Sequence, residues 1–178
     1  MFPVWFNGNE TFNYVPQGKI KVLQIGVYTG DATEWLVNNR DIEFIHDVDT
    51  WQGSREDAHD ALSFSEVEKY YDSRFADNKK IVKFKYTSDH FFNTIPQEET
   101  YDFIYIDGDH TALQVALDGL NAFRVLKSGG IMGFDDYLWN SGMEGWLRPQ
   151  PGVDAFLSVC QDKYTLIHKS EQVWIQKK

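Results

Sequence analysis

Residues 22–33, VLQIGVYTGDAT, decide the fold, because an apolar run passes through two glycines directly into a helix-like segment. The pattern predicts a strand over 19–27 and a helix over 31–39. Gly26 and Gly30 let the backbone turn tightly and approach a ligand, and the start of the helix offers N–H groups without intrahelical partners. Glycines in strand–helix turns are often purely structural, so the turn by itself leaves both interpretations open.

The next apolar strand, 42–49, ends at Asp49, about 20 residues after the glycine turn. A carboxylate at this spacing is typical of an acceptor for the ribose hydroxyls of a nucleoside cofactor. The alternative is that Asp49 is only a turn residue. The glycine spacing differs from the GxGxxG pattern of dinucleotide sites, which disfavours NAD and FAD. Together, the turn and Asp49 predict a nucleoside-cofactor site.

Strand-like and helix-like segments alternate along the rest of the chain, which is typical of an α/β fold with a largely parallel sheet. Further strands are predicted over 80–88, 101–107, 131–136, 163–170 and 171–178, and further helices over 54–77 and 153–162. A helix between the fourth and fifth strands is expected to bury the face formed by Leu113, Ala116, Leu117, Leu120 and Phe123. We predict one domain over 1–178, with residues 1–17 as an N-terminal extension or lid.

The composition of the chain argues against several classes of protein. The formal net charge of −10 argues against a nucleic-acid binder or a protein that binds anionic membranes. The single cysteine, Cys160, allows no internal disulfide and is expected in a helix as part of the core. No apolar run approaches the roughly 20 residues of a membrane span. We therefore expect a soluble, cytoplasmic protein whose partner is a small molecule.

Two predicted strands end in carboxylates. The stretch YDFIYIDGDH, 101–110, finishes at Asp107, Asp109 and His110, and GGIMGFDDYLW, 129–139, contains Asp135 and Asp136. A buried carboxylate is costly unless it is paired or bound to a ligand. Asp109 is expected to cap the following helix, since Asp is favoured at helix starts.

Four motifs occur in order: VLQIGVYTGDAT, DVDTWQGS, YDFIYIDGDH and LKSGGIMGFDDY. With them the chain resembles class I S-adenosylmethionine-dependent methyltransferases over roughly residues 20 to 140. The most similar branch is that of the macrocin O-methyltransferase-like proteins, with catechol O-methyltransferase more distant. The resemblance implies a Rossmann-like, seven-stranded sheet ordered 3-2-1-4-5-7-6, with the last strand antiparallel and helices on both faces. It also implies a cofactor lying across the strand ends.

The resemblance assigns the cofactor contacts to residues that follow the first four strands. Asp49 would hold the ribose hydroxyls and Trp51 would cover the adenine, although Trp51 has an alternative place in the core. Ser88 and Asp89 would approach the adenine, although Ser88 has an alternative role as a helix cap. The remaining contacts with S-adenosylmethionine would come from Gln24, Gly26, Tyr28, Gly30 and Asp107.

Gln24 departs from the pattern of the relatives. Most of them place a carboxylate two residues before the first glycine, where it helps to orient the amino-acid end of the cofactor. Glutamine still forms hydrogen bonds but supplies no charge. The departure predicts a weaker affinity for the cofactor rather than its loss.

The two acidic strand ends are neighbours in the implied sheet, so Asp107, Asp135 and Asp136 are expected to converge. Three carboxylates suit a hard divalent cation such as Mg²⁺, and the resemblance implies that these positions hold it. Such an ion lowers the pKa of a bound hydroxyl. His110 stands where the relatives place a catalytic base, and a neutral imidazole suits that role. The alternatives are a loop-capping Asp107 and a structural His110.

The sequence thus predicts an S-adenosylmethionine-dependent methyltransferase that acts on a hydroxyl of a small molecule, such as a sugar or a phenol. A catalytically impaired cofactor-binding or interaction module of the same fold is the alternative, and a nucleotide-dependent oxidoreductase is a third possibility. Residues 137–152, with Tyr137, Trp139 and Trp146, are candidates for the acceptor pocket, with buried packing or a dimer seam as alternatives. An open cleft would favour a homodimer.

Overall fold

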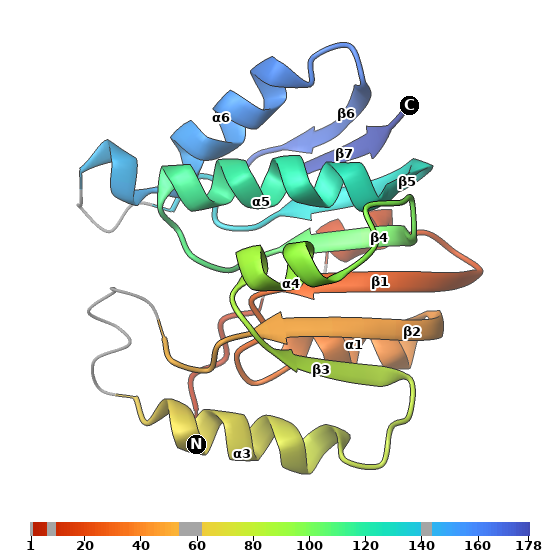
Figure 1. Cartoon of the computed structure of the whole chain (residues 1–178), viewed down its shortest axis with the longest axis vertical. Coiled ribbons are helices and arrows are strands. Elements are labelled where there is room, and N and C mark those ends of the chain that lie inside the picture. Colours follow the sequence, from red (N-terminus) through yellow and green to blue (C-terminus); the bar gives the residue numbers. More distant parts are fainter. Residues whose placement is uncertain (1, 7–9, 54–61, 140–143) are drawn as a thin grey trace.

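The computed structural model describes residues 2–6, 10–53, 62–139 and 144–178. Its centre is a seven-stranded sheet with the order β3-β2-β1-β4-β5-β7-β6 (Figure 1). The strands are β1 Lys19–Ile25, β2 Asp41–Asp49, β3 Ile81–Lys85, β4 Tyr101–Ile106, β5 Leu126–Phe134, β6 Tyr164–Lys169 and β7 Val173–Lys177. Strands β1 to β5 pair in parallel, and β7 runs antiparallel to both β5 and β6. The predicted strand order and the antiparallel last strand are confirmed.

Helices cover both faces of the sheet. They are η1 Thr11–Tyr14, α1 Asp31–Asn39, α3 Phe64–Phe75, α4 Ser88–Thr94, α5 Ala112–Val125, η2 Gly145–Leu147 and α6 Pro149–Val159. Helices α4, α5 and α6 lie on one face, α1 lies on the other, and α3 runs beside the edge strand β3 (Figure 1). Of the helix predicted over 54–77, residues 54–61 lie outside the described residues. Within the described ranges, no helix combines the length and apolarity that a membrane crossing requires.

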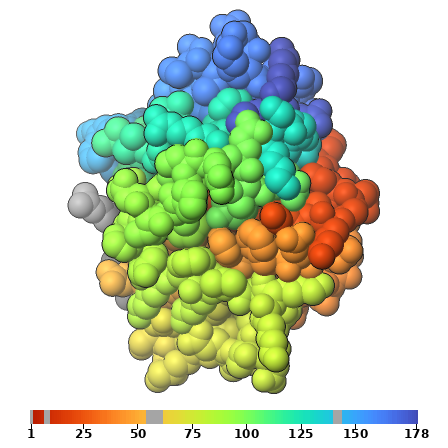
Figure 2. All heavy atoms as spheres, turned by 45° about the vertical axis from the view of Figure 1, so that its right-hand side comes forward, coloured from red at the N-terminus to blue at the C-terminus, as the bar shows by residue number. Residues whose placement is uncertain are grey.

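Each face of the sheet has its own apolar core. The core under α4, α5 and α6 includes Leu23, Ile104, Phe134 and Phe156, and Cys160 is buried in it as expected. The opposite core contains Phe12 of η1, which packs edge-on against Tyr105 and Trp174. The N-terminal part of the chain, red in the space-filling view, accordingly lies against the body of the molecule (Figure 2). The predicted N-terminal extension thus contributes a fully buried side chain, Phe12.

The predicted buried face of α5 is only partly right, because Leu120 and Phe123 pack against the core but the two leucines before them do not. Leu113 and Leu117 are 72% and 37% exposed, and the helix instead buries Val115, Asp118, Gly119, Ala122 and Val125. Small residues on this face bring the helix close to the sheet. A Cβ on Gly119 would lie only 3.0 Å from the ring of Phe134. The periodicity of large apolar residues therefore predicts the packing of Leu120 and Phe123, but not of the small residues that lie closest to the sheet.

Candidate functional site

The glycine turn between β1 and α1 is fixed against the end of β4. Gly26 has a φ of +79° and Gly30 a φ of +84°, both in the left-handed region that favours glycine. A Cβ on Gly26 would lie 1.9 Å from the backbone oxygen of Asp107. Only glycine fits there, and the turn therefore lies directly beside the first acidic strand end. Gly30 instead packs against Tyr71 and Phe75 of α3.

Asp49, at the end of β2, holds the glycine turn through its carboxylate. Oδ2 accepts hydrogen bonds from the backbone N–H groups of Val27 at 2.7 Å and Tyr28 at 2.9 Å. Oδ1 accepts one from the backbone N–H of Trp51 at 2.6 Å. A carboxylate has about four acceptor positions, so three protein bonds leave room for a further donor. Asp49 is therefore at the turn, as its spacing indicated, and its bond to a ribose stays a prediction.

Gln24 lies beneath the turn and faces the interior of the protein. It is 2% exposed, donates a hydrogen bond to the backbone oxygen of Gly26 at 3.1 Å and accepts one from Thr33 Oγ1 at 3.2 Å. The same hydroxyl lies 2.9 Å from Oδ2 of Asp47, which also accepts a bond from the Tyr71 hydroxyl at 2.7 Å. Asp47 is fully buried, and burial raises its pKa to about 7.

Asp47 was missed by the reasoning from sequence. Its only local signal is that it stands two residues before Asp49 in the same strand, and so on the same side of the sheet. A strand-end carboxylate that is exposed and one that is buried look the same in sequence. The difference comes from α1 and α3, whose Thr33 and Tyr71 surround Asp47.

Trp51 is buried rather than open to the cofactor cleft. It is 3% exposed and packs with Val27, Val67 and Tyr71, while its Nε1 donates a hydrogen bond to the backbone oxygen of Tyr28 at 2.9 Å. This position matches the core alternative. A role over the adenine stays a prediction that would require the indole to become exposed.

Ser88 and Asp89 begin α4, at the carboxyl end of β3. Gln114 of α5 donates from Nε2 to Ser88 Oγ at 3.1 Å and lies 3.3 Å from Asp89 Oδ1. The helix cap is Thr87, whose hydroxyl accepts from the N–H of His90, so Ser88 is not the cap. A groove of about 380 Å³ opens beside these residues, lined by Thr50, Gln52, Lys85, Tyr86, Thr87 and His90. The predicted adenine contacts thus lie next to an open groove.

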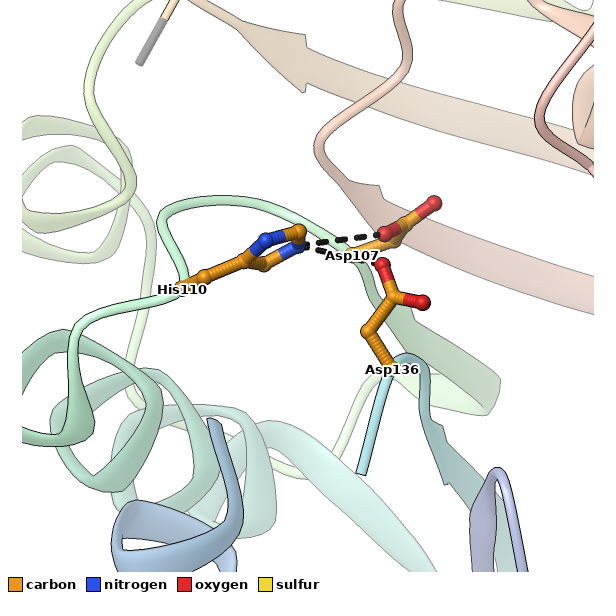
Figure 3. Close-up of side chains that lie close together, drawn as sticks. All are labelled: Asp107, His110 and Asp136. Carbon is orange, nitrogen blue, oxygen red and sulfur yellow. Dashed lines mark ion pairs between the residues drawn. The ribbon is translucent and has the colours of Figure 1, made fainter. Parts of the chain in front are cut away.

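Three polar side chains meet where β4 and β5 end: Asp107, His110 and Asp136 (Figure 3). His110 Nε2 lies 3.3 Å from Asp136 Oδ2 and 3.8 Å from Asp107 Oδ1. One ligand atom from each residue can be chosen so that all three lie within 4.8 Å of one another. Burial, reinforced by the neighbouring charges of Asp135 and Asp136, raises the pKa of Asp107 well above its usual range. Carboxylates and an imidazole at this separation are a donor set that fits a divalent cation.

Asp135 differs from the predicted arrangement, because its carboxylate is held by other side chains. Its Oδ2 accepts a short hydrogen bond from the Tyr105 hydroxyl, and its Oδ1 accepts one from Gln172 Nε2 at 2.8 Å. The structure therefore brings Asp107 and Asp136 together with His110, while Asp135 lies near enough for its charge to raise the pKa of Asp107. Gln172, just before β7, was missed in the sequence, where nothing local relates it to Asp135.

The surroundings of His110 are aromatic on one side. The ring of Trp139 lies 4.9 Å from the imidazole, whereas Tyr137 is 6% exposed and donates its hydroxyl proton to Asp154 at 3.0 Å. Trp146 is 57% exposed. The expectation that Asp109 caps the next helix is wrong: Thr111 is the cap of α5, and Asp109 accepts a bond from the backbone N–H of Thr111.

Comparison with known proteins shows the family and the fold. A model of a family described as a methyltransferase domain matches residues 23–137, well over half of the chain. No curated protein matches the chain. The O-methyltransferase from Bacillus cereus, solved with S-adenosylhomocysteine (SAH), is 16% identical, with a TM-score of 0.61 over 88% of this chain and 74% of that one.

Two further solved structures are similar in fold. The SAH-bound methyltransferase PaMTH1 from Podospora anserina is 15% identical, with a TM-score of 0.59 over 89% of this chain and 71% of that one. The N-methyltransferase NodS from Bradyrhizobium japonicum is 14% identical, with a TM-score of 0.58 over 90% and 87%. The sheet order, the glycine turn and the family match lead to one conclusion: the chain belongs to the methyltransferase domain family and has the class I S-adenosylmethionine-dependent methyltransferase fold.

Proposed function

We propose that this protein transfers a methyl group from S-adenosylmethionine to a hydroxyl of a small molecule, with the help of a divalent cation. The observation that carries the proposal is the meeting of Asp107, His110 and Asp136 beside the glycine turn (Figure 3). Gly26 touches the backbone of Asp107, so a methyl donor seated on the turn would lie next to these groups. The O-methyltransferase from Bacillus cereus, which has the same fold, was solved with SAH.

The turn fits the proposed cofactor in two respects. The left-handed Gly26 brings the turn against the backbone of Asp107, so that a ligand on the turn would lie beside the first acidic strand end. The hydroxyl of Tyr28 is buried and has no hydrogen-bond partner among the described residues, so a polar ligand at the turn would satisfy it. The cofactor itself supplies a methyl group that its sulfonium already activates. The protein then needs mainly to position the acceptor and remove a proton.

In this proposal Asp107 and Asp136 hold the cation, which would lower the pKa of an acceptor hydroxyl. His110 accepts the hydroxyl proton at Nε2, the atom that faces both carboxylates. Nε2 cannot bind the cation and accept the proton at the same time. Assigning it the proton leaves the carboxylates as the protein ligands, which suits Mg²⁺ or Mn²⁺.

Binding and turnover test the proposal separately. Isothermal titration with SAH should give a heat of binding, and electron paramagnetic resonance should show Mn²⁺ binding. With labelled S-adenosylmethionine and a panel of sugars and phenols, at least one acceptor should gain a methyl group. His110→Gln should keep the Mn²⁺ affinity within about threefold and lower turnover at least about 100-fold. Asp136→Asn should lose the metal, and a wild-type protein that binds no SAH would defeat the whole proposal.

A second candidate is a cofactor-binding module without catalysis. It is supported by Gln24, which stands where most relatives have a carboxylate and faces Thr33 rather than the cleft. This candidate predicts SAH binding with no methyl transfer to any acceptor of the panel. Turnover that depends on His110 would exclude it.

A further inference from the structure

Asp135 and Asp136 are adjacent in sequence, yet their carboxylates point to different surroundings. Asp136 faces His110, whereas Asp135 faces Tyr105 and Gln172. Tyr105 is completely buried and Gln172 is 6% exposed. Both oxygens of Asp135 are therefore engaged with buried donors. These bonds fix the orientation of the Asp135 carboxylate, and removing that carboxylate would leave a buried amide and hydroxyl unsatisfied, which is costly.

Asp136 has a φ of +53°, a left-handed conformation that is unfavourable for a residue with a side chain. Such backbone persists only where the surroundings impose it. Here the backbone N–H of Asp136 donates to Asp135 Oδ1 at 2.8 Å. In this conformation Oδ2 of Asp136 reaches within 3.3 Å of His110 Nε2. The carboxylate of Asp135 thus fixes the turn that aims Asp136 at its partners.

Gln172 in turn is fixed from two distant segments. Its Oε1 accepts hydrogen bonds from Trp174 Nε1 at 3.0 Å and from the hydroxyl of Thr11 in η1. Its Nε2 donates to Asp135 and lies 3.0 Å from the Tyr105 hydroxyl. Every polar atom of this buried amide has a partner, so its orientation is unambiguous. A chain of hydrogen bonds therefore runs from Thr11 in η1 through Gln172 and Asp135 to the backbone of Asp136.

We propose that Asp135, held by Gln172 and Tyr105, is a positioning residue that sets the left-handed turn of Asp136. The inference rests on the proposed function only in one respect: its first test measures the binding of a divalent cation. It predicts that Gln172, far from the cation, controls the affinity for it.

The test compares Mn²⁺ affinity by electron paramagnetic resonance in four variants. Gln172→Leu and Tyr105→Phe should each weaken binding by about 10-fold, the low end of what outer ligand-orienting groups contribute. Asp136→Asn should abolish binding. The control, Gln176→Leu, removes an exposed glutamine of β7 that bonds only to the backbone of Gly129, and should leave affinity unchanged. Unchanged or tighter binding in both Gln172→Leu and Tyr105→Phe would overturn the proposal.

A readout without metal separates this inference from the proposed function. Crystal structures of Gln172→Leu and Tyr105→Phe should show Asp136 leaving the left-handed region and its carboxylate moving away from His110. Gln176→Leu should keep both features. If the wild type binds no Mn²⁺, the metal part of the proposed function fails, while these structures still decide the role of Asp135. Asp136 that stays left-handed in both variants would refute it.

Discussion

Gln24 and Asp47 are register partners on the parallel strands β1 and β2, and the hydroxyl of Thr33 lies between their side chains. That hydroxyl has one hydrogen but faces two acceptors, Gln24 Oε1 and Asp47 Oδ2. A proton on Asp47 allows both contacts, because Asp47 then donates to Thr33 and Thr33 donates to Gln24. This agrees with burial raising the pKa of Asp47 to about 7. The protonated acid thus satisfies both contacts of Thr33, while Oδ1 of Asp47 has no hydrogen-bond partner among the described residues.

Gln24→Glu should destabilise the protein rather than restore a useful carboxylate. The substitution removes the N–H donor to Gly26 and adds a second buried acid beside Asp47. We expect a loss of about 2 kcal/mol in the free energy of unfolding, measured in urea at pH 7.5. In the Asp47→Asn background the loss should be smaller by about 1 kcal/mol, since the like charge is gone. An equal loss in both backgrounds would contradict the coupling.

His46 and Asp47 should make opposite contributions to the pH dependence of stability. Burial lowers the pKa of His46 to about 4, so its contribution is present above pH 6.5 and is lost as pH falls toward 4. The raised pKa of Asp47 means that its contribution is present below pH 3.8 and is lost as pH rises toward 7. Between about pH 4 and 6.5 the two therefore nearly cancel in the wild type.

Single substitutions should reveal how Asp47 and His46 each change the free energy of unfolding with pH. Asp47→Asn mimics the protonated acid, so its stability relative to wild type should rise with pH by up to about 1.4 kcal/mol per unit between pH 4.5 and 6.5. His46→Phe should show the reverse slope, with stability relative to wild type falling as pH rises. Urea unfolding at several pH values measures both. Parallel curves for wild type and Asp47→Asn would show that Asp47 does not titrate in this range.

The fold could be predicted from the sequence because its signals are local. The helix predicted over 31–39 is α1 to the residue, and the apolar runs locate all seven strands. The buried face of α5 could be predicted only in part. Which side of a helix packs closest depends on small residues such as Gly119, and apolar periodicity gives them no weight.

The candidate site could be predicted only in part. Asp107 and Asp136 follow directly from strand ends that meet at one edge of a parallel sheet. The orientation of Asp135 depends on Gln172, which is 37 residues away in sequence, and on a left-handed backbone at Asp136. Both are consequences of tertiary packing. The sequence therefore predicts which carboxylates converge but not which of them faces His110.

Asp49→Asn should weaken cofactor binding and loosen the glycine turn. The amide keeps one acceptor oxygen, whereas the carboxylate uses both of its oxygens for Val27, Tyr28 and Trp51. We expect the affinity for SAH to fall at least about 10-fold in isothermal titration, and stability to fall by about 1–2 kcal/mol. Asp41→Asn, the same change at the exposed opposite end of β2, should alter neither. Unchanged SAH affinity in Asp49→Asn would exclude Asp49 from the cofactor site.

Gly26→Ala and Gly129→Ala separate close contact from backbone strain. Both glycines have φ near +80°, so alanine is strained at either position and should cost about 1 kcal/mol. At Gly129 a Cβ would meet nothing within 4 Å, so the loss of stability should not exceed this cost of backbone strain. At Gly26 the Cβ would lie 1.9 Å from the backbone oxygen of Asp107, which only movement of β1 away from β4 relieves. We therefore expect Gly26→Ala to lose more than about 4 kcal/mol.

Urea unfolding and the yield of folded protein measure both glycine variants, and SAH binding reports on the turn itself. Gly129→Ala should bind SAH as the wild type does, because Gly129 lies in β5, far along the strand from its carboxyl end. Gly26→Ala should either fail to fold or fold without binding SAH, since the turn and Asp107 can no longer touch. Similar stability losses in the two variants would mean that backbone strain alone, and not contact with Asp107, explains the glycine at position 26.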